Sequence, residues 1–318
     1  MNIVILDGHT LNPGDNPWTA LEKLGQVTVY DRTPAGQIVE RARDAEILLT
    51  NKTLLNADTL AQLPKLKFIA VLATGYNVVD VVVAAKRGIP VCNVPIYSTK
   101  TVAQHTFALI LELCDHVGLH DQSVREGEWT RCVDFCYWKA PLLELDGKVL
   151  GLIGGGRIGQ AVGTIGRAFG MNVWVTPSRS RPTVTEAGWS VKSVEEIFHE
   201  ADVISLHCPQ TAANAGFVNR ALLATMKPTA LLINTARGGL IVEEDLAEAL
   251  ENGVLAGAAV DVVSAEPIKA DNPLLRTPRC LITPHIAWSS LPARQRLTAV
   301  SAENVRGFLE GKITNRVN

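Results

Sequence analysis

The sequence predicts an α/β protein built from two doubly wound parallel sheets that follow one another along the chain. Short apolar segments alternate with helix-like segments through residues 1–100, which is the pattern of a parallel sheet covered by helices. A second series of the same kind begins near residue 149. That series opens with a strand, a glycine-rich turn and a helix in direct succession. We therefore expect two α/β domains rather than one.

The individual elements follow from the apolar pattern. In the first series we expect strands at residues 3–6, 27–30, 47–50, 68–72 and 90–94, with helices at 18–24, 38–43 and 57–63. In the second series we expect strands at 150–153, 173–175, 203–207, 230–234, 257–261 and 280–283. Longer helices at 102–113 and 293–309 flank this series and predict two chain crossings. The predicted domains are residues 1–100 with 286–318, and residues 101–285, with an active-site cleft between them.

Composition narrows the class of protein. The chain has 318 residues, of which 47% are hydrophobic, so it can bury a full core. A formal charge of -2 provides no basic field for nucleic acid, and no run of about 20 apolar residues predicts a membrane span. The amino-terminal segment has the pattern of a first strand rather than of a signal peptide. We expect a cytoplasmic protein that binds neither nucleic acid nor membrane.

The six cysteines are scattered along the chain, so we expect free thiols rather than disulfides. Cys132 and Cys136 are four residues apart, and Cys114, His116 and His120 precede them. A second tight pair of ligands does not complete this group, and the histidines lack the glutamate of a zinc-protease helix. We therefore predict no metal.

The turn at residues 154–159 has the pattern of a dinucleotide phosphate site. Gly154 permits the tight turn, Gly156 lets the backbone approach a pyrophosphate, and Gly159 lets the helix pack on the strand. Arg157 and Ile158 open the helix, whose amino-terminal N–H groups favour an anion. The alternative is a plain strand-to-helix turn.

Ordered motifs extend over nearly the whole chain. They read A-T-G-Y-N-V-V-D, V-A-Q-H-T, the glycine turn, S-L-H-C-P, N-T-A-R-G, D-V-V-S-A-E-P and T-P-H-I-A-W-S. In these motifs the chain resembles the D-isomer-specific 2-hydroxyacid dehydrogenases, and in particular their glycerate dehydrogenase and hydroxypyruvate/glyoxylate reductase branch. The resemblance implies a flavodoxin-like substrate domain and a Rossmann cofactor domain. It also implies NAD(P)H-dependent reduction of small 2-oxo acids to D-2-hydroxy acids.

Three residues at predicted strand ends suit this chemistry. His285 can supply the proton that the developing alkoxide needs, because imidazole titrates near neutral pH. Glu266 would orient the ring and favour its protonated form, and Arg237 would bind the substrate carboxylate and polarise the carbonyl. Taken singly, each has an ordinary alternative: a packed histidine, a turn glutamate and a surface arginine.

The resemblance implies further site residues. Substrate binding is expected at Lys52, Thr74 and Gly75 in addition to Arg237 and His285, although a solvated lysine and a turn glycine are the alternatives. Cofactor contacts are expected from strand-end segments of the second domain. Asp261 could instead cap a turn, and His207 is expected to form a wall rather than to act as an acid. The expected wall and contact residues are His207, Cys208, Pro209, Thr235, Ala236 and Asp261.

The end of the second Rossmann strand indicates which dinucleotide binds. An acidic residue there accepts hydrogen bonds from the ribose of NAD, but Thr176 and Pro177 occupy the place. Ser178, Arg179 and Ser180 follow and would hold the 2′-phosphate of NADP. We therefore expect NADP(H) to be preferred, with NAD(H) possible.

Two further expectations concern partners. The small 2-oxo acid is the expected ligand, and the Trp- and Cys-rich segment 121–145 fits neither sheet, so by family analogy we expect it to reach a second copy in a homodimer. The rival hypothesis is a dinucleotide-sensing scaffold or corepressor-like protein on the same fold.

Overall fold

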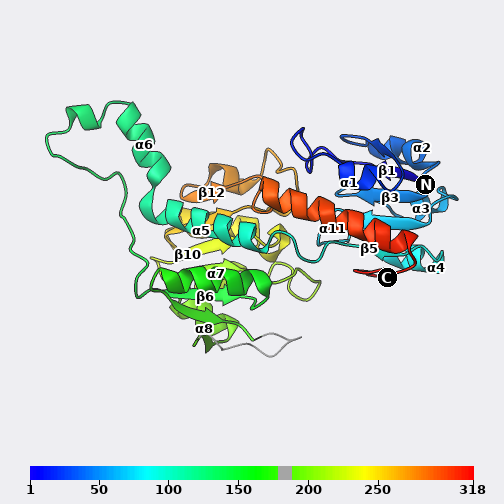
Figure 1. The fold of residues 1–318 in the computed structure, drawn as a ribbon. Helices are drawn as coiled ribbons and strands as arrows, with labels where there is room; N and C mark the ends of the chain where they lie inside the picture. The colour runs from blue at the N-terminus through cyan, green and yellow to red at the C-terminus, as the bar shows by residue number, and fades with distance from the viewer. Residues whose placement is uncertain (178–187) are drawn as a thin grey trace. The chain divides into compact units, whose positions relative to one another are not determined.

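The computed structural model describes residues 1–177 and 188–318 and divides them into two compact units (Figure 1). Unit 1 comprises Met1–Ser98 and Ser289–Asn318, and unit 2 comprises Thr99–Trp288. Each unit contains one parallel sheet, with five strands in unit 1 and seven in unit 2. This architecture confirms the predicted fold class. In the described part of the chain, no helix is long and apolar enough to cross a membrane.

The sheet of unit 1 has the strand order β2-β1-β3-β4-β5, which is the flavodoxin-like order. All its neighbouring strands pair in parallel. The strands are β1 (Asn2–Ile5), β2 (Gln26–Val29), β3 (Ile47–Thr50), β4 (Phe68–Val71) and β5 (Val91–Cys92). The last strand is shorter than expected, because the N–H groups of Asn93 and Val94 bond to carbonyls of Asn315 and Ala73 outside the ladder.

Helices cover the sheet of unit 1 and bury its apolar side chains. They are α1 (Thr19–Glu22), α2 (Ile38–Ala42) after the turn η1 (Ala35–Gln37), α3 (Ala57–Ala61), α4 (Val81–Lys86) and α11 (Leu291–Leu309). Residues of α2, α3 and α4 join Leu48 and Ile69 of the strands in one core. The carboxy-terminal helix α11 packs on β4, where Phe308 stacks on Phe68 at 4.7 Å between ring centroids. The returning tail is therefore part of this unit.

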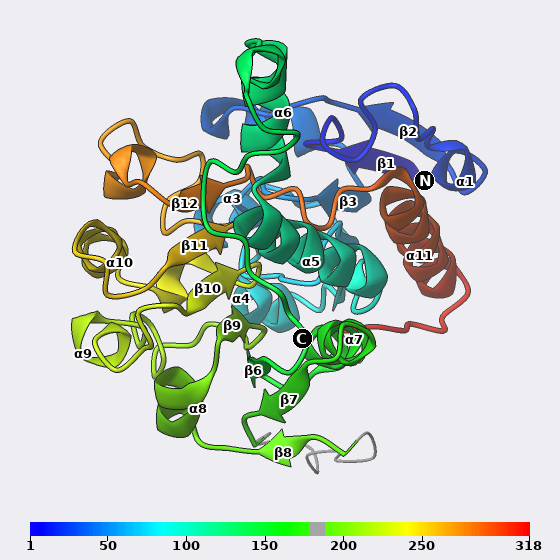
Figure 2. The ribbon, with the colours of Figure 1, turned by 90° about the vertical axis from the view of Figure 1, so that its left-hand side faces the viewer.

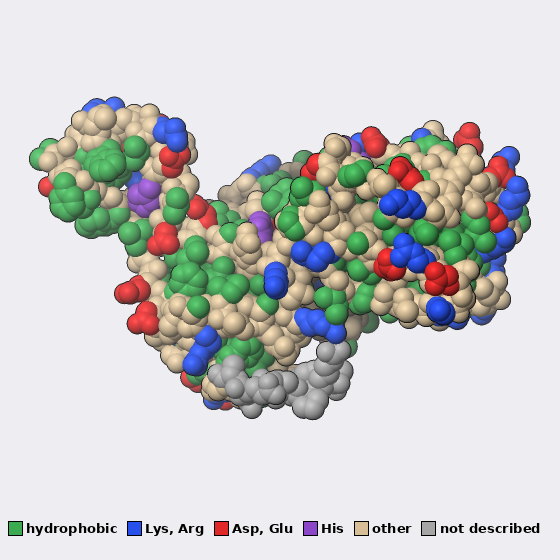
Figure 3. All heavy atoms as spheres, in the orientation of Figure 1, with side chains coloured by type: hydrophobic (Ala, Val, Ile, Leu, Met, Phe, Trp, Pro, Cys, Tyr) green, Lys and Arg blue, Asp and Glu red, His purple; other side chains and the backbone are tan. Residues whose placement is uncertain are grey.

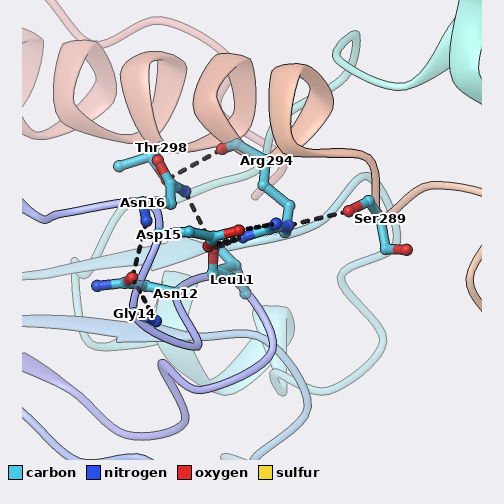
Figure 4. A network of polar contacts seen from close by, with 8 residues as sticks. All are labelled: Leu11, Asn12, Gly14, Asp15, Asn16, Ser289, Arg294 and Thr298. Atoms are coloured by element: carbon cyan, nitrogen blue, oxygen red, sulfur yellow. Dashed lines mark hydrogen bonds and ion pairs between the residues drawn. The ribbon is translucent and has the colours of Figure 1, made fainter.

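Arg294, near the start of α11, is the centre of a polar network in unit 1 (Figure 4). Its buried guanidinium donates to both carboxylate oxygens of Asp15, at 2.6 and 2.7 Å. It also donates to the carbonyls of Leu11 and Ser289, at 3.0 and 2.9 Å. The hydrogen bond from Arg294 lowers the pKa of Asp15, so this pair adds stability at neutral pH and loses it as the pH falls through the lowered value.

The sheet of unit 2 has the order β12-β11-β10-β9-β6-β7-β8. This is the Rossmann order with one additional strand, and the direction of winding reverses between β6 and β9. All neighbouring strands again pair in parallel. The strands are β6 (Val149–Ile153), β7 (Asn172–Val175), β8 (Ser190–Val191), β9 (Val203–Leu206), β10 (Leu231–Asn234), β11 (Gly257–Val260) and β12 (Cys280–Ile282).

Two apolar cores lie on the two faces of this sheet, each under its own helices (Figure 2). One face carries α5 (Thr99–Asp115) and α7 (Arg157–Ala168), where Phe107 stacks on Phe169 at 5.4 Å. The other face carries α8 (Val194–Glu200), α9 (Arg220–Leu223) and α10 (Glu243–Glu251). Because both faces are covered, the central strands β9, β10 and β11 consist entirely of buried residues.

A long excursion leaves unit 2 after α5 and returns at β6. We call residues 117–142 the arm; it contains α6 (Val117–Arg125) and the turn η2 (Trp129–Arg131) and projects away from the sheet of its unit (Figure 1). Bonds within the arm hold it together, including Ser123 Oγ to Tyr137 Oη at 2.7 Å. Apolar side chains gather on its surface (Figure 3). The most exposed are Val133, Phe135 and Trp138, at 100%, 88% and 69%.

Candidate active site

The residues expected to carry chemistry in unit 2 follow strands that all point the same way. Gly154 follows β6, His207 follows β9, Thr235 follows β10, Asp261 follows β11, and His285 lies three residues after the end of β12. Because these strands are parallel neighbours, their carboxyl ends meet at one edge of the sheet. Ligands of open α/β sheets bind at this edge, next to the reversal of strand order.

The glycine turn is built on two close backbone approaches. Gly154 has φ +116°, and a Cβ there would lie 2.7 Å from the carbonyl of His207, so a side chain would clash with the backbone that follows β9. A Cβ on Gly159 would lie 2.1 Å from the carbonyl oxygen of Gly154. By contrast, a Cβ on Gly156 would meet nothing within 4 Å. The turn therefore leaves its outer side, at Gly156, open.

The open side of the turn is the amino terminus of α7. Gly156 is the N-cap residue of this helix, and its first turn consists of Arg157, Ile158 and Gly159. Within the described residues, no side chain caps the helix. Free N–H groups and the positive end of the helix dipole therefore face outward beside a glycine that admits a close ligand. These features fit the pyrophosphate of a dinucleotide.

His285 and Glu266 form the closest pair of functional side chains. Nδ1 of His285 lies 2.7 Å from Oε2 of Glu266, and both side chains remain about one-third exposed, at 28% and 33%. The remaining ring nitrogen, Nε2, has no bond to any described residue. The pair therefore has an oriented imidazole with one nitrogen available to a ligand, which is the arrangement of a general acid or base.

The backbone around His285 is held by the buried carboxylate of Asp261, whose side chain is 1% exposed. His285 has φ +55°, a left-handed conformation that is unfavourable for a non-glycine residue. Asp261 accepts bonds from Thr283 Oγ1 at 2.6 Å and from the N–H groups of Ile286 and Ala287 at 2.8 and 2.9 Å. Asp261 thus caps the turn that carries His285.

His105 on α5 joins the same cluster. Its Nε2 lies 3.1 Å from Thr283 Oγ1 and 3.6 Å from Asp261 Oδ1. A protonated His105 would therefore add a cation beside the only buried carboxylate that contacts this turn in the described part of the chain.

Arg237 is exposed at the end of β10, and its backbone is held by a fully buried asparagine. Asn234 donates from Nδ2 to the carbonyl of Arg237 at 2.9 Å and accepts from the N–H of Ala236 at 3.0 Å. The guanidinium donates one bond to the carbonyl of Ala236 at 2.7 Å. Most of its donors therefore remain available to an anionic ligand.

Two of the expected wall residues, His207 and Cys208, have uncharged side chains at neutral pH. Burial lowers the pKa of His207 to about 4, and its Nε2 lies 2.9 Å from Ser205 Oγ. His207 is therefore neutral at neutral pH and unsuited to act as the acid. Burial also raises the pKa of the Cys208 thiol, and Pro209 follows as the acceptor of a bond from Asn214.

Unit 1 carries the remaining substrate candidates at the carboxyl edge of its own sheet. Lys52 is exposed after β3, in a loop held by the carboxylate of Asp7. Asp7 accepts bonds from three successive N–H groups, those of Asn51, Lys52 and Thr53, at 2.7, 2.6 and 2.7 Å. The Nδ2 of Asn51 in turn donates to the carbonyl of Leu72 at 2.6 Å, which links this loop to the next one.

Thr74 and Gly75 lie in the loop after β4. Thr74 donates from Oγ1 to the carbonyl of Val94 at 2.8 Å, and its own carbonyl accepts from Asn93 at 2.7 Å. Gly75 follows as a half-buried residue. The Lys52 and Thr74 loops are therefore held within one hydrogen-bonded edge of unit 1.

The residues that would distinguish NADP from NAD are only partly described. Ser178, Arg179 and Ser180 lie outside the described residues. Thr176, which stands in place of the acidic residue, is buried and accepts a bond from the N–H of Gly154 at 3.0 Å. Its hydroxyl thus supports the glycine turn.

The sequence alone did not identify the residues whose hydrogen bonds support the loops of the candidate site. Asp7, Asn234 and Thr283 each follow or end a strand, which was a signal that they lie at the ligand-binding edge. The partners of Asp7 and Thr283 are distant in the sequence, so the roles of these two residues could not be deduced from local pattern. Among the described residues, no three His, Cys, Asp or Glu side chains are grouped to hold a metal ion.

Two alanine substitutions separate the packing of the turn from its ligand contact. Gly159→Ala places a Cβ against backbone, so we expect a lower melting temperature and weak dinucleotide binding. Gly156→Ala meets no protein atom, so we expect the melting temperature of the parent but reduced dinucleotide affinity. Thermal unfolding and fluorescence titration with NADPH measure both effects. Parental affinity in Gly156→Ala would show that the dinucleotide does not approach this glycine.

Comparisons with known proteins agree with this geometry. The family model described as D-isomer specific 2-hydroxyacid dehydrogenase, NAD binding domain, matches residues 107–287. Hydroxypyruvate reductase of Blautia hydrogenotrophica is 47% identical over 321 residues, which cover 100% of both chains. Two solved structures are also similar. An acyclic imino acid reductase in complex with NADPH and D-Arg has a TM-score of 0.88 and 30% identity, with 100% of both chains covered.

The second structure is the NADPH-dependent glyoxylate/hydroxypyruvate reductase of Sinorhizobium meliloti in complex with NADP and malonate. It has a TM-score of 0.84 and 28% identity, and the match covers 99% of this chain and 96% of that one. The family model alone spans more than half of the 318 residues. The chain therefore belongs to the D-isomer-specific 2-hydroxyacid dehydrogenases, a family of NAD(P)-dependent oxidoreductases.

Proposed function

We propose that the protein reduces small 2-oxo acids, such as hydroxypyruvate and glyoxylate, to D-2-hydroxy acids and prefers NADPH to NADH. The observation that carries this proposal is the 2.7 Å pair of His285 and Glu266 at the same sheet edge as Arg237. The relative named hydroxypyruvate reductase supports the choice of substrate, because it matches the whole chain.

His285 is the proposed proton donor. Glu266 holds Nδ1, so Nε2 is the nitrogen that gives its proton to the oxygen of the substrate carbonyl. The carboxylate of Glu266 also stabilises the positive charge that the ring carries before this transfer. A bound nicotinamide supplies the hydride that adds to C2, so that the 2-oxo acid gains one hydride and one proton.

Arg237 is the proposed anchor of the substrate carboxylate. Its planar guanidinium can form two parallel bonds to a carboxylate and keep a charge at every relevant pH. In unit 1, Lys52, Thr74 and Gly75 are the proposed substrate-binding residues. Lys52 offers a cation, and the N–H groups of the Thr74 loop offer neutral donors.

The dinucleotide would be held by Gly154, Gly156 and Gly159 with the first turn of α7, at Arg157 and Ile158. His207, Cys208, Pro209, Thr235, Ala236 and Asp261 are the proposed walls of its site. The preference for NADPH rests on Thr176, which removes the carboxylate that would repel a 2′-phosphate, and on Ser178, Arg179 and Ser180 in the sequence that follows. The two similar structures with NADPH or NADP in their names support this preference.

A substrate panel with both coenzymes tests the proposal. We expect the highest kcat/KM with hydroxypyruvate or glyoxylate and NADPH. The variant Arg179→Ala should raise the KM for NADPH and leave that for NADH nearly unchanged, because only NADPH carries the 2′-phosphate. Steady-state kinetics measure both values. A preference for NADH in the parent would contradict the coenzyme assignment, and tight NADPH binding without turnover of any 2-oxo acid would favour the scaffold hypothesis.

Three variants test the assigned roles. His285→Gln should lower kcat by about 10²- to 10⁴-fold and leave NADPH affinity unchanged, because only proton transfer is lost. Arg237→Ala should raise KM and lower kcat together.

Glu266→Gln keeps a bond to the ring but removes the charge that favours its protonated form. As the pH rises, the rate of reduction should therefore begin to decrease at a lower pH than in the parent. An unchanged pH–rate profile would contradict the role of Glu266.

The arm is the proposed contact with a second copy of the chain. Val133, Phe135 and Trp138 are large apolar side chains with little burial in the single chain, and such a surface is typical of an interface. A groove of about 410 Å³ lies elsewhere on the arm, lined by α6 residues such as Val124 together with Tyr137 and Leu142. The arm thus has an exposed apolar tip, formed by Val133, Phe135 and Trp138, and an apolar groove beside α6.

Replacing the tip should change the oligomeric state. We expect a dimer for the parent and a monomer for the double variant Val133→Ser and Phe135→Ser, because the variant removes apolar area from the interface. Light scattering coupled to gel filtration measures the mass. Val82→Ser on α4, where the valine is also exposed at 61%, is the control and should remain dimeric. A parent that is monomeric at all concentrations would refute this proposal.

A further inference from the structure

Glu243, the first residue of α10, has a buried carboxylate held by three neutral donors. Its side chain is 7% exposed. Oε1 accepts from the N–H of Ser264 at 2.6 Å, and Oε2 accepts from Ser264 Oγ and from Asn272 Nδ2, both at 2.8 Å. Buried carboxylates are costly unless they are fully hydrogen-bonded, so this one is maintained by these bonds.

The donors belong to the loop that carries Glu266. Ser264 precedes Glu266 by two residues, and the N–H of Val263 lies 3.4 Å from Glu266 Oε1. Asn272 stands at the far end of the loop, where its Oδ1 caps η4 (Pro273–Arg276) by accepting from the N–H of Leu274 at 3.0 Å. Glu243 therefore binds this loop on both sides of Glu266.

Glu243 is also close to the Arg237 loop along the chain. The turn η3 (Gly238–Leu240) leads from Arg237 to α10. A Cβ on Gly238 would lie 1.9 Å from the carbonyl carbon of Val263, so the two loops touch through their backbones. Glu243 thus fastens the Glu266 loop to the element that presents Arg237.

The charge of Glu243 suits this task. A carboxylate offers several acceptor sites, and bonds to a charged acceptor are stronger than those between neutral groups. Its place in the first turn of α10 also sets it at the favourable end of the helix dipole. An apolar side chain of similar volume would leave the N–H of Ser264 and the amide of Asn272 without these acceptors.

We propose that Glu243 is a positioning residue for proton delivery. It holds the segment from Ser264 to Glu266 so that the Glu266 carboxylate stays in line with Nδ1 of His285. The inference rests on the proposed function of the His285–Glu266 pair. Glu243 acts on the imidazole through Ser264 and Glu266. A small displacement of the Glu266 carboxylate would weaken the orientation of the imidazole.

The matched variants Glu243→Gln and Glu244→Gln test this inference. Glutamine keeps the shape of the side chain, but its amide NH₂ must face donors, so at least one bond to Ser264 or Asn272 is lost. For Glu243→Gln we expect kcat with hydroxypyruvate to fall about 10- to 100-fold, with NADPH affinity unchanged. The pH above which the rate of reduction decreases should be lower than in the parent, as for Glu266→Gln. Glu244 is exposed on the same helix, so Glu244→Gln should behave as the parent.

A merely structural role would lower the melting temperature of Glu243→Gln and leave kcat and the pH profile at parental values, and this result would overturn the inference. If Glu243→Gln does not fold, Ser264→Ala takes its place, because it removes only the Oγ bond. Ser264→Ala should move the pH limit in the same direction by a smaller amount, and a parental profile would overturn the inference.

Failure of the proposed function gives a different result. If the parent turns over no 2-oxo acid, the proposed function fails, and NMR titration of the His285 ring in the protein alone decides the positioning role. We expect the midpoint of that titration to be lower in Glu243→Gln than in the parent and in Glu244→Gln. An unmoved midpoint would overturn the inference independently of any activity.

Discussion

Parallel pairing of β6, β9, β10, β11 and β12 is the constraint on which the candidate site depends. Each strand ends at the same edge, so segments from residue 154 to residue 285 are brought together without any local sequence relation. The backbone that follows β9 lies close enough to the end of β6 to exclude a side chain at Gly154. The glycine turn and the His285–Glu266 pair are thus consequences of one sheet geometry.

Three carboxylates accept hydrogen bonds from backbone N–H groups and other neutral donors in the loops that carry the candidate residues. Asp7 in unit 1 holds three successive N–H groups of the Lys52 loop, Asp261 caps the turn of His285, and Glu243 binds the loop of Glu266. In each case a carboxylate orders a loop that would otherwise have no regular hydrogen bonding. Because loops carry the functional side chains, such bonds set the precision with which those side chains are presented.

The left-handed backbone of His285 illustrates the cost of this precision. A non-glycine residue at φ +55° is unfavourable in isolation, and it persists because the surrounding bonds determine it. The N–H of His285 bonds to the carbonyl of Asp261 at 2.8 Å, and the side chain of Asp261 holds the next two residues. The turn therefore aims the imidazole at Glu266, where the 2.7 Å bond completes its orientation.

The sequence by itself determined the fold class, the described strands of both sheets except the short β8, and the candidate triad of Arg237, Glu266 and His285. Apolar periodicity and glycine placement are local properties, and the ordered motifs name the triad directly. Tertiary structure decided which of the three acidic residues at the start of α10 is buried, why Thr176 supports Gly154, and how Asp261 caps its turn. These contacts join residues that lie far apart along the chain, so only the packing of parallel strands and their loops could bring them together.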